Sequence, residues 1–255
     1  STCVDFTDLN AVKNAINPNT KVIYTEVISN PTMTVVDIKK LADIAHEINA
    51  KLIVDNTFTT SVVIQPIKLG ADITINSLTK FMNGHSDIVG GSMTSTAETV
   101  DKASKLQALL GCTLDPMSSY LCERSLRTLE IRMQRQLDNA EKLAKALSED
   151  SHVIHVNHPS LPQHPQHNLA VQMFKKGFGA MLSFEMPEDR EKINSFMRRL
   201  KIVKYAMTLG GYATTLSYPI LSSHGNVPRE IRLKMGITDG LMRCVEVAEE
   251  PECGM

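Results

Sequence analysis

The feature that most restricts the fold of this chain is the alternation of short apolar strands with amphipathic helices in its first half. Four segments have the length and apolar character of buried strands: 21–27 (KVIYTEV), 51–55 (KLIVD), 71–76 (ADITIN) and 87–94 (DIVGGSMT). Between the first two, Asp37 is a suitable N-cap for a helix with Ile38 and Leu41 on one face. Such alternation is typical of βαβ units, so we predict a mainly parallel sheet covered by helices.

The rest of the chain has a different pattern. Residues 96–110 and 116–149 carry apolar residues at helical spacing, which predicts a bent or interrupted pair of long helices. Near the start, Thr7 is the predicted N-cap of a further helix. The last hundred residues contain three predicted strands and a helix: 153–157, 180–186, 241–247 and 189–200. We therefore predict an α/β chain with a large domain over residues 1–135 and a smaller C-terminal α/β domain over 136–255.

Composition excludes several classes of function. The 27 Lys and Arg residues balance 28 Asp and Glu residues, so we expect no nucleic-acid partner and no membrane binding. No apolar run approaches the ~18–20 residues of a membrane-spanning helix. The five cysteines are widely spaced with no CxxC pair, which predicts reduced thiols and a cytoplasmic protein. The first glycine is Gly70 and later glycines form no phosphate-binding motif, so nucleotide cofactors are disfavoured.

Polar side chains follow three of the predicted strands. These segments are 29–30 (SN), 55–57 (DNT) and 77–80 (SLTK). Because ligands bind beyond the carboxyl ends of parallel strands, an acid, hydroxyls and a lysine are expected to converge there. A lysine can form a Schiff base, an acid can keep a pyridine nitrogen protonated, and hydroxyls can bind phosphate, which together is the binding pattern of pyridoxal phosphate. Taken singly, Lys80 is better explained as a solvated lysine and Asp55 as a helix cap.

Seven segments of the chain, in order and spread over nearly its whole length, resemble the Cys/Met-metabolism family of pyridoxal-phosphate enzymes. They are IYTEVISNPT, VDNTF, GADITINSLTKFMNGHSDIVGG, RSLRTLEIRM, PSLPQHPQH, TLGGYATTLSYP and GITDGLMR. The resemblance implies an aspartate-aminotransferase-like (fold type I) architecture. It also implies pyridoxal 5'-phosphate as the cofactor.

The same resemblance implies roles for individual residues. Lys80 matches the Schiff-base lysine and Asp55 the partner of the pyridinium nitrogen. Ser77 and Thr79 match the residues that hold the cofactor phosphate. Asn30 matches a residue beside both the cofactor ring oxygen and the substrate.

Two further positions match the substrate side of the site. Arg243 matches the arginine that binds the substrate α-carboxylate, a role suited to the guanidinium fork. Thr208 matches a position, usually serine in the family, that orients the catalytic lysine and adjoins the substrate. Both residues lie in the C-terminal half of the chain.

The activity implied is that of a carbon–sulfur lyase acting on a sulfur amino acid. Such an enzyme performs γ-elimination on cystathionine, methionine or homocysteine and releases a 2-oxo acid, ammonia and a thiol. A β-lyase and a γ-replacement synthase of the same family are alternatives, and so is a non-catalytic truncated family fragment. Family members are homotetramers, so self-association is expected.

The chain starts inside the region that family members possess. Their preceding portion supplies backbone amides for the phosphate, a tyrosine that stacks on the pyridine ring, and residues that reach a neighbouring subunit. No segment of this chain matches that portion, which predicts that the polypeptide alone is a poor catalyst.

A cluster of histidines gives one other candidate site. His152, His155, His158, His164 and His167 lie within sixteen residues, and imidazole is a common zinc ligand. No cysteine or carboxylate completes a clear tetrad, however, and a site needs ligand count as well as residue type. We therefore predict no metal in this segment.

Overall fold

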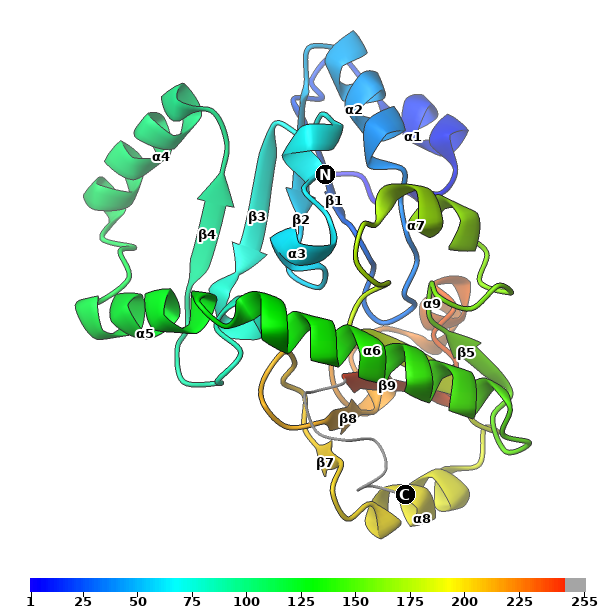
Figure 1. Ribbon diagram of the computed structural model, residues 1–255. Coiled ribbons are helices and arrows are strands. Elements are labelled where there is room, and N and C mark those ends of the chain that lie inside the picture. The colour runs from blue at the N-terminus through cyan, green and yellow to red at the C-terminus, as the bar shows by residue number, and fades with distance from the viewer. Residues whose placement is uncertain (246–255) are drawn as a thin grey trace.

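The computed structural model describes residues 1–245, and its first half is built on a four-stranded sheet. The strands are β1 (Val22–Glu26), β2 (Lys51–Asp55), β3 (Ile73–Ser77) and β4 (Gly91–Thr94). Their order is β1-β2-β3-β4; the first three are parallel and β4 is antiparallel (Figure 1). The predicted mainly parallel sheet is thus confirmed. In the part of the chain that the structure describes, β1 and β4 each keep one edge without a neighbouring strand.

Short helices connect these strands. They are α1 (Leu9–Ala15), α2 (Ile38–Glu47), α3 (Thr60–Val63) and the turns η1 (Pro66–Leu69) and η2 (Leu78–Met82). Asp37 caps α2 as predicted, accepting the Lys40 N–H at 3.1 Å. The N-cap predicted for α1 is wrong, because Asp8 accepts the orphan N–H groups of that helix. The Thr7 hydroxyl instead donates to Asp5 at 2.7 Å.

Three helices follow β4: α4 (Ala97–Leu110), α5 (Pro116–Leu126) and α6 (Leu129–Ser148). The interruption predicted for the second long segment falls between α5 and α6. Helix α4 has no buried residue and lies apart from β4 (Figure 1). Helix α6 packs Met133 and Leu137 in the core of the first sheet and Ala144 in the core of the second. The domain boundary predicted at residues 135 and 136 falls inside this shared helix and stays a prediction.

The second half forms a five-stranded sheet in the order β5-β6-β9-β8-β7. Its strands are β5 (His155–Asn157), β6 (Met181–Glu185), β7 (Lys204–Tyr205), β8 (Thr215–Ser217) and β9 (Leu241–Val245). The accompanying helices are α7 (His167–Met173), α8 (Arg190–Arg199), η3 (Pro219–Leu221) and α9 (Arg229–Lys234). The last two residues of the strand predicted over 241–247 lie outside the described residues.

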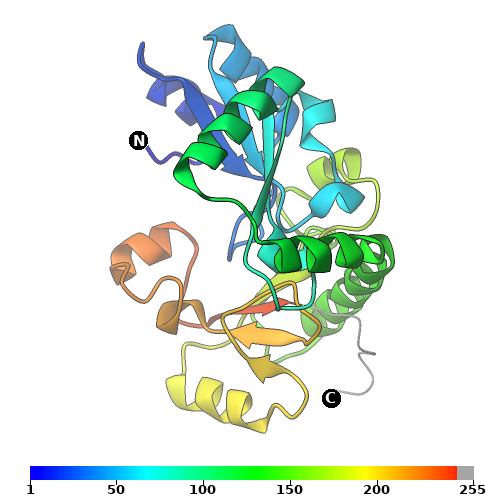
Figure 2. The same ribbon diagram turned by 90° about the vertical axis from the view of Figure 1, so that its left-hand side faces the viewer.

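The relative position of the two sheets places the functional side chains. Figure 2 shows the first sheet above the second, with the carboxyl ends of the parallel strands directed toward the second sheet. Side chains that follow β1, β2 and β3 therefore face residues of the C-terminal half. Among the helices of residues 1–245, none is long and apolar enough to cross a membrane.

Candidate active site

The ends of β2 and β3 are tied together around Asp55. The Thr57 N–H donates to Asp55 Oδ1 at 2.8 Å, and the Tyr24 hydroxyl on β1 donates to Asp55 Oδ2 at 3.3 Å. The Ser77 N–H at the end of β3 donates to Thr57 Oγ1 at 2.8 Å. The first two donors fix the orientation of the Asp55 carboxylate at the edge of the sheet, and the third joins the ends of β2 and β3.

Lys80 lies in the irregular turn η2 that follows β3 directly. Its backbone leaves helical geometry, with φ −98° and ψ −134°. Burial lowers the pKa of Lys80, and the nearby positive charge of Arg243 lowers it further. A lowered pKa increases the fraction of unprotonated amine, which is the form that attacks a carbonyl.

Arg132 on α6 holds the turn that carries Lys80. Its Nη1 donates to the Phe81 carbonyl at 2.9 Å, and its Nη2 donates to the Met82 and Ser125 carbonyls at 3.0 and 2.9 Å. Gly84 has φ +73°, and a Cβ there would lie 2.0 Å from Arg132 Nη1. The sequence analysis missed this positioning arginine, because two of its three partners are backbone carbonyls about fifty residues away.

A loop in the second half of the chain, just before β8, packs closely against the backbone of Lys80. Gly210 has φ +71°, and a Cβ at this position would lie 2.5 Å from Phe81 N and 2.8 Å from the Lys80 carbonyl carbon. Only glycine fits both the left-handed conformation and the close approach. The contact brings Gly210 beside the backbone of the predicted catalytic lysine.

Arg243 is the buried cation of the site. It lies on β9 at 5% exposure, its Nη1 donates to Asn30 Oδ1 at 3.3 Å, and its Nη2 donates to the Met207 carbonyl at 3.2 Å. Among residues 1–245, its Nε has no hydrogen-bond partner and no carboxylate forms an ion pair with the guanidinium. The facing Ser217 Oγ on β8 is also buried and unpartnered. A buried guanidinium without an anion is suited to a carboxylate ligand.

The predicted hydroxyl groups differ in their contacts. Ser77 Oγ takes part in no recorded hydrogen bond in the described chain. Thr79 Oγ1 accepts the Gly90 N–H at 3.0 Å and makes a longer contact of 3.4 Å to the Gly90 carbonyl. The Thr208 side chain is exposed, with no recorded hydrogen bond to Lys80 within residues 1–245. The roles predicted for these three residues stay predictions.

Glu26 is a second acid in the site that the sequence analysis missed. It pairs in register with Asp55 on adjacent parallel strands, and its Oε2 accepts the Asn30 N–H at 3.2 Å. Burial, and then the charge of Asp55, raise the pKa of Glu26 from 4.5 to about 7. The sequence did contain a signal for this residue, because Glu26 is a carboxylate within the largely apolar strand segment 21–27.

The raised pKa of Glu26 predicts a pH-dependent stability. The folded protein binds more protons than the unfolded chain between pH 4.5 and 7, so stability falls as pH rises through this range. Glu26→Gln removes this titrating group and with it the pH dependence. We therefore expect the free energy of unfolding of the variant, relative to wild type, to be about 2–3 kcal/mol higher at pH 8 than at pH 4.5. Urea unfolding at both pH values measures it; equal differences would contradict the prediction.

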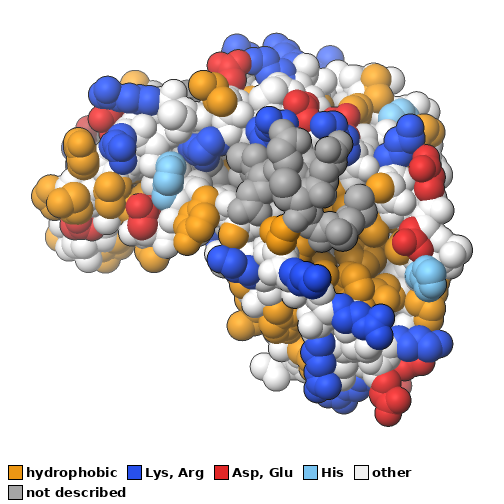
Figure 3. Space-filling view, turned by 60° about the horizontal axis from the view of Figure 1, so that its bottom comes forward, with side chains coloured by type: hydrophobic (Ala, Val, Ile, Leu, Met, Phe, Trp, Pro, Cys, Tyr) orange, Lys and Arg blue, Asp and Glu red, His pale blue; other side chains and the backbone are white. Residues whose placement is uncertain are grey.

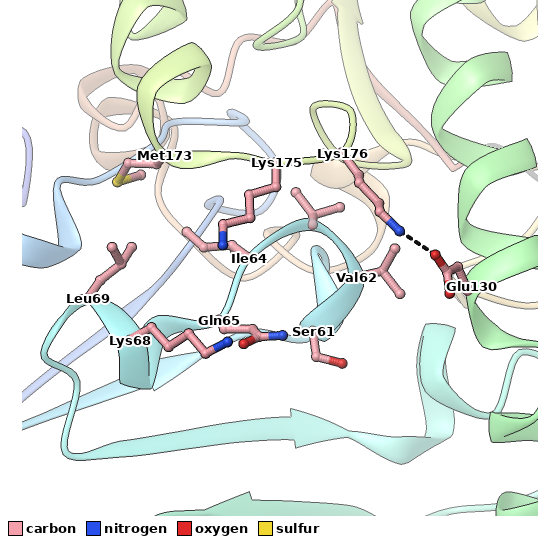
Figure 4. Close-up of a pocket in the computed structure, with 11 residues that line it drawn as sticks. Ser61, Val62, Ile64, Gln65, Lys68, Leu69, Glu130, Met173, Lys175 and Lys176 are labelled. Carbon is pink, nitrogen blue, oxygen red and sulfur yellow. Dashed lines mark hydrogen bonds and ion pairs between the residues drawn. The ribbon is translucent and has the colours of Figure 1, made fainter.

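Two other features lie away from these residues. His158 is fully buried, with Nε2 3.1 Å from the Gly179 carbonyl, and burial lowers its pKa to about 4. No group of three possible ligands that could hold a metal ion occurs among the described residues. A cavity of about 520 Å³ (Figure 4) has an apolar wall and a rim that includes Lys68 and Lys175, but no predicted site residue lines it.

Comparisons with known proteins show the family and the fold. A profile described as Cys/Met metabolism PLP-dependent enzyme matches residues 1–250. The chain belongs to this family. It is 40% identical to cystathionine gamma-lyase of Bacillus subtilis, covering 99% of this chain and 66% of that protein. It is 39% identical to cystathionine beta-lyase of Coxiella burnetii, covering 94% of this chain and 62% of that protein.

A solved structure has the same fold. The crystal structure of cystathionine gamma-lyase from Lactobacillus plantarum complexed with L-serine superposes with a TM-score of 0.93 at 38% identity. The match covers 98% of this chain and 66% of the solved chain. The predicted fold type I architecture and family are thus confirmed. The chain spans just under two thirds of the length of these relatives.

The residues present fit the pyridoxal phosphate on which the family depends. An anchored carboxylate at Asp55, a lysine with a lowered pKa and the unpartnered Arg243 Nε supply the groups expected for the ring nitrogen, the aldehyde and a substrate carboxylate. Ser77, whose N–H donates to Thr57 Oγ1 at the end of β3, also carries a hydroxyl that could bind the phosphate. The family's cofactor and the donor set of this chain therefore agree.

Proposed function

We propose that this protein is a pyridoxal-phosphate-dependent carbon–sulfur lyase that acts by γ-elimination on a sulfur amino acid. The observation that carries the proposal is the buried guanidinium of Arg243, which has no ion-pair partner among residues 1–245 and lies close enough to Lys80 to lower its pKa. An amino acid substrate has the carboxylate that Arg243 would bind and the amino group that must reach Lys80. The relatives include both a gamma-lyase and a beta-lyase.

Each side chain has a defined task in this proposal. Bound pyridoxal phosphate supplies an aldehyde that combines with amines and a protonated ring that withdraws electrons. Asp55 keeps a negative charge beside the ring nitrogen. Arg243 holds the substrate carboxylate in a bidentate manner. Lys80, with its lowered pKa, accepts and returns protons at Cα and Cβ as general base and acid.

The substitution Asp55→Ala is expected to lower turnover far more than it raises KM. The carboxylate acts mainly when negative charge develops toward the ring, so its loss weakens transition-state stabilisation. A charge-assisted hydrogen bond of about 1.5–3 kcal/mol corresponds to at least about a tenfold loss in kcat. Asp43→Ala, an exposed carboxylate on α2, is the matched control. If turnover is unchanged in Asp55→Ala, Asp55 acts only as a structural cap and takes no part in the reaction.

Product analysis tests the proposed reaction. The protein, saturated with pyridoxal phosphate, is given cystathionine, methionine and homocysteine, and the released 2-oxo acid and thiol are measured. γ-Elimination of cystathionine yields 2-oxobutanoate, ammonia and cysteine, whereas β-elimination yields pyruvate, ammonia and homocysteine. Pyruvate as the product would overturn γ-elimination in favour of the β-lyase alternative.

Two other outcomes separate the remaining alternatives. Replacement of the acyloxy group of an activated homoserine ester by an added thiol, with release of the carboxylic acid and no 2-oxo acid, would indicate a γ-replacement synthase. Cofactor binding at Lys80 without any turnover would favour a non-catalytic family fragment. That outcome would fit the relatives' greater length.

The proposed enzyme works in the cytoplasm as a homotetramer, and the surface supports self-association. Helix α4 exposes Leu106, Leu109 and Leu110, and Figure 3 shows apolar side chains over the left-hand lobe where α4 and α5 lie. An apolar surface of this kind is typical of an interface. We expect an assembly larger than a monomer in size-exclusion chromatography at micromolar concentration. A sharp monomer peak would contradict it.

A further inference from the structure

A chain of contacts runs from β2 through Glu26 to the substrate-binding arginine. Glu26 stands beside Asp55 in the parallel register of β1 and β2, and its Oε2 accepts the Asn30 N–H at 3.2 Å. The side chain of Asn30 then accepts Arg243 Nη1 at 3.3 Å. Asn30 thereby joins the first sheet to a residue 213 positions further along the chain.

The turn that carries Asn30 is held in two different ways. Within the turn, the Ser29 N–H donates to the Thr34 carbonyl at 2.9 Å, and the Thr34 N–H donates to Ser29 Oγ at 3.0 Å. These bonds close the turn but do not involve the Asn30 amide. The Glu26 carboxyl group makes the one hydrogen bond recorded for that amide among residues 1–245. Glu26 therefore determines how Asn30 is presented to Arg243.

The groups around Glu26 give its carboxylate no favourable charge partner among the described residues. The titratable groups that face it are Asp55 on β2 and Tyr24 on its own strand, whose pKa is raised to about 12. No Lys or Arg of the described residues forms an ion pair with Glu26, so its burial beside Asp55 is unfavourable electrostatically. A hydrophobic side chain would remove that cost but would leave the Asn30 amide without an acceptor.

We propose that Glu26 is a positioning residue: its carboxyl group fixes Asn30, and through Asn30 it sets the orientation of the Arg243 guanidinium. The inference rests on the proposed function only for the statement that Arg243 binds the substrate carboxylate. A side chain that accepts the Asn30 N–H is sufficient for the role. Glutamine at position 26 therefore preserves it and alanine does not.

Nuclear magnetic resonance of the full chain tests the proposal without relying on turnover. In Glu26→Ala, we expect hydrogen exchange at the Asn30 amide to become about tenfold faster, the effect of losing one hydrogen bond. We also expect the Arg243 Nε–H signal to shift. In Glu26→Gln, both should stay close to wild type, because the amide oxygen still accepts the Asn30 N–H. Glu47→Ala, an exposed carboxylate at the end of α2, should change neither.

Kinetics give a second readout that a purely structural role would not move. With L-methionine and saturating pyridoxal phosphate, Glu26→Ala should raise KM about tenfold with a smaller change in kcat, and Glu26→Gln should restore KM. If Glu26→Ala does not fold, Glu26→Met removes the acceptor at similar side-chain length. An Arg243 signal that stays in place without the acceptor, or that moves equally in Glu26→Gln, would overturn the proposal. If the spectra change as expected but the wild-type protein shows no turnover, the proposed function is refuted and the positioning role of Glu26 is not.

Discussion

Replacing Lys80 with alanine should abolish the yellow absorbance that develops when the protein is mixed with pyridoxal phosphate. The absorbance arises from an imine, which only an unprotonated amine can form. Burial and the charge of Arg243 lower the pKa of Lys80, so this amine is unprotonated more often than an exposed lysine. Lys68→Ala, which removes an exposed lysine, should leave the absorbance intact.

Chemical trapping locates the imine directly. Reduction of the cofactor-loaded wild type with borohydride, followed by peptide mapping, should label the peptide that contains Lys80. Label on Lys68 or Lys175, or an undiminished absorbance in Lys80→Ala, would show that another amine holds the cofactor.

Gly210→Ala should cause a large loss of stability, because its added methyl group would meet backbone atoms of the Lys80 turn. A left-handed φ costs alanine about 1 kcal/mol, and the added Cβ would lie 2.5 Å from Phe81 N, which must then move. Together these effects predict a loss of about 2–4 kcal/mol in the free energy of unfolding. The shift would also displace Lys80, so imine formation should weaken in parallel.

The chain offers a matched control for this prediction. Gly111 has nearly the same φ, +73°, but a Cβ there would meet nothing within 4 Å. Gly111→Ala should therefore lose only the backbone contribution of about 1 kcal/mol. Urea unfolding of both variants measures the difference. Equal losses would mean that the contact between Gly210 and the Lys80 turn is unimportant.

Residues at strand ends could be predicted from the sequence, because their positions depend on the apolar segments directly before them. The apolar runs before Asp55 and Lys80 define β2 and β3, and parallel pairing then brings their carboxyl ends to one edge. Arg243 could be assigned only by resemblance, because its position depends on how the two halves of the chain meet.

The residues that were missed share a different property. Glu26, Arg132 and Gly210 act through contacts with backbone or side chains whose proximity is set by tertiary packing. A carboxylate within a strand, an arginine on a helix and a glycine in a loop each have ordinary explanations when read singly. The wrong cap at Thr7 has a local cause, since Asp5 competes for its hydroxyl.

In residues 1–245, β1 and β4 each have an edge with no neighbouring strand, and this affects how these residues behave in solution. Each edge presents a row of backbone N–H and C=O groups that another extended chain can pair with, and β1 also exposes Val22 and Tyr24. Partly folded molecules that meet at such edges form mixed sheets and precipitate. Refolding yield should therefore fall as protein concentration rises, and dilute refolding favours recovery of the native chain.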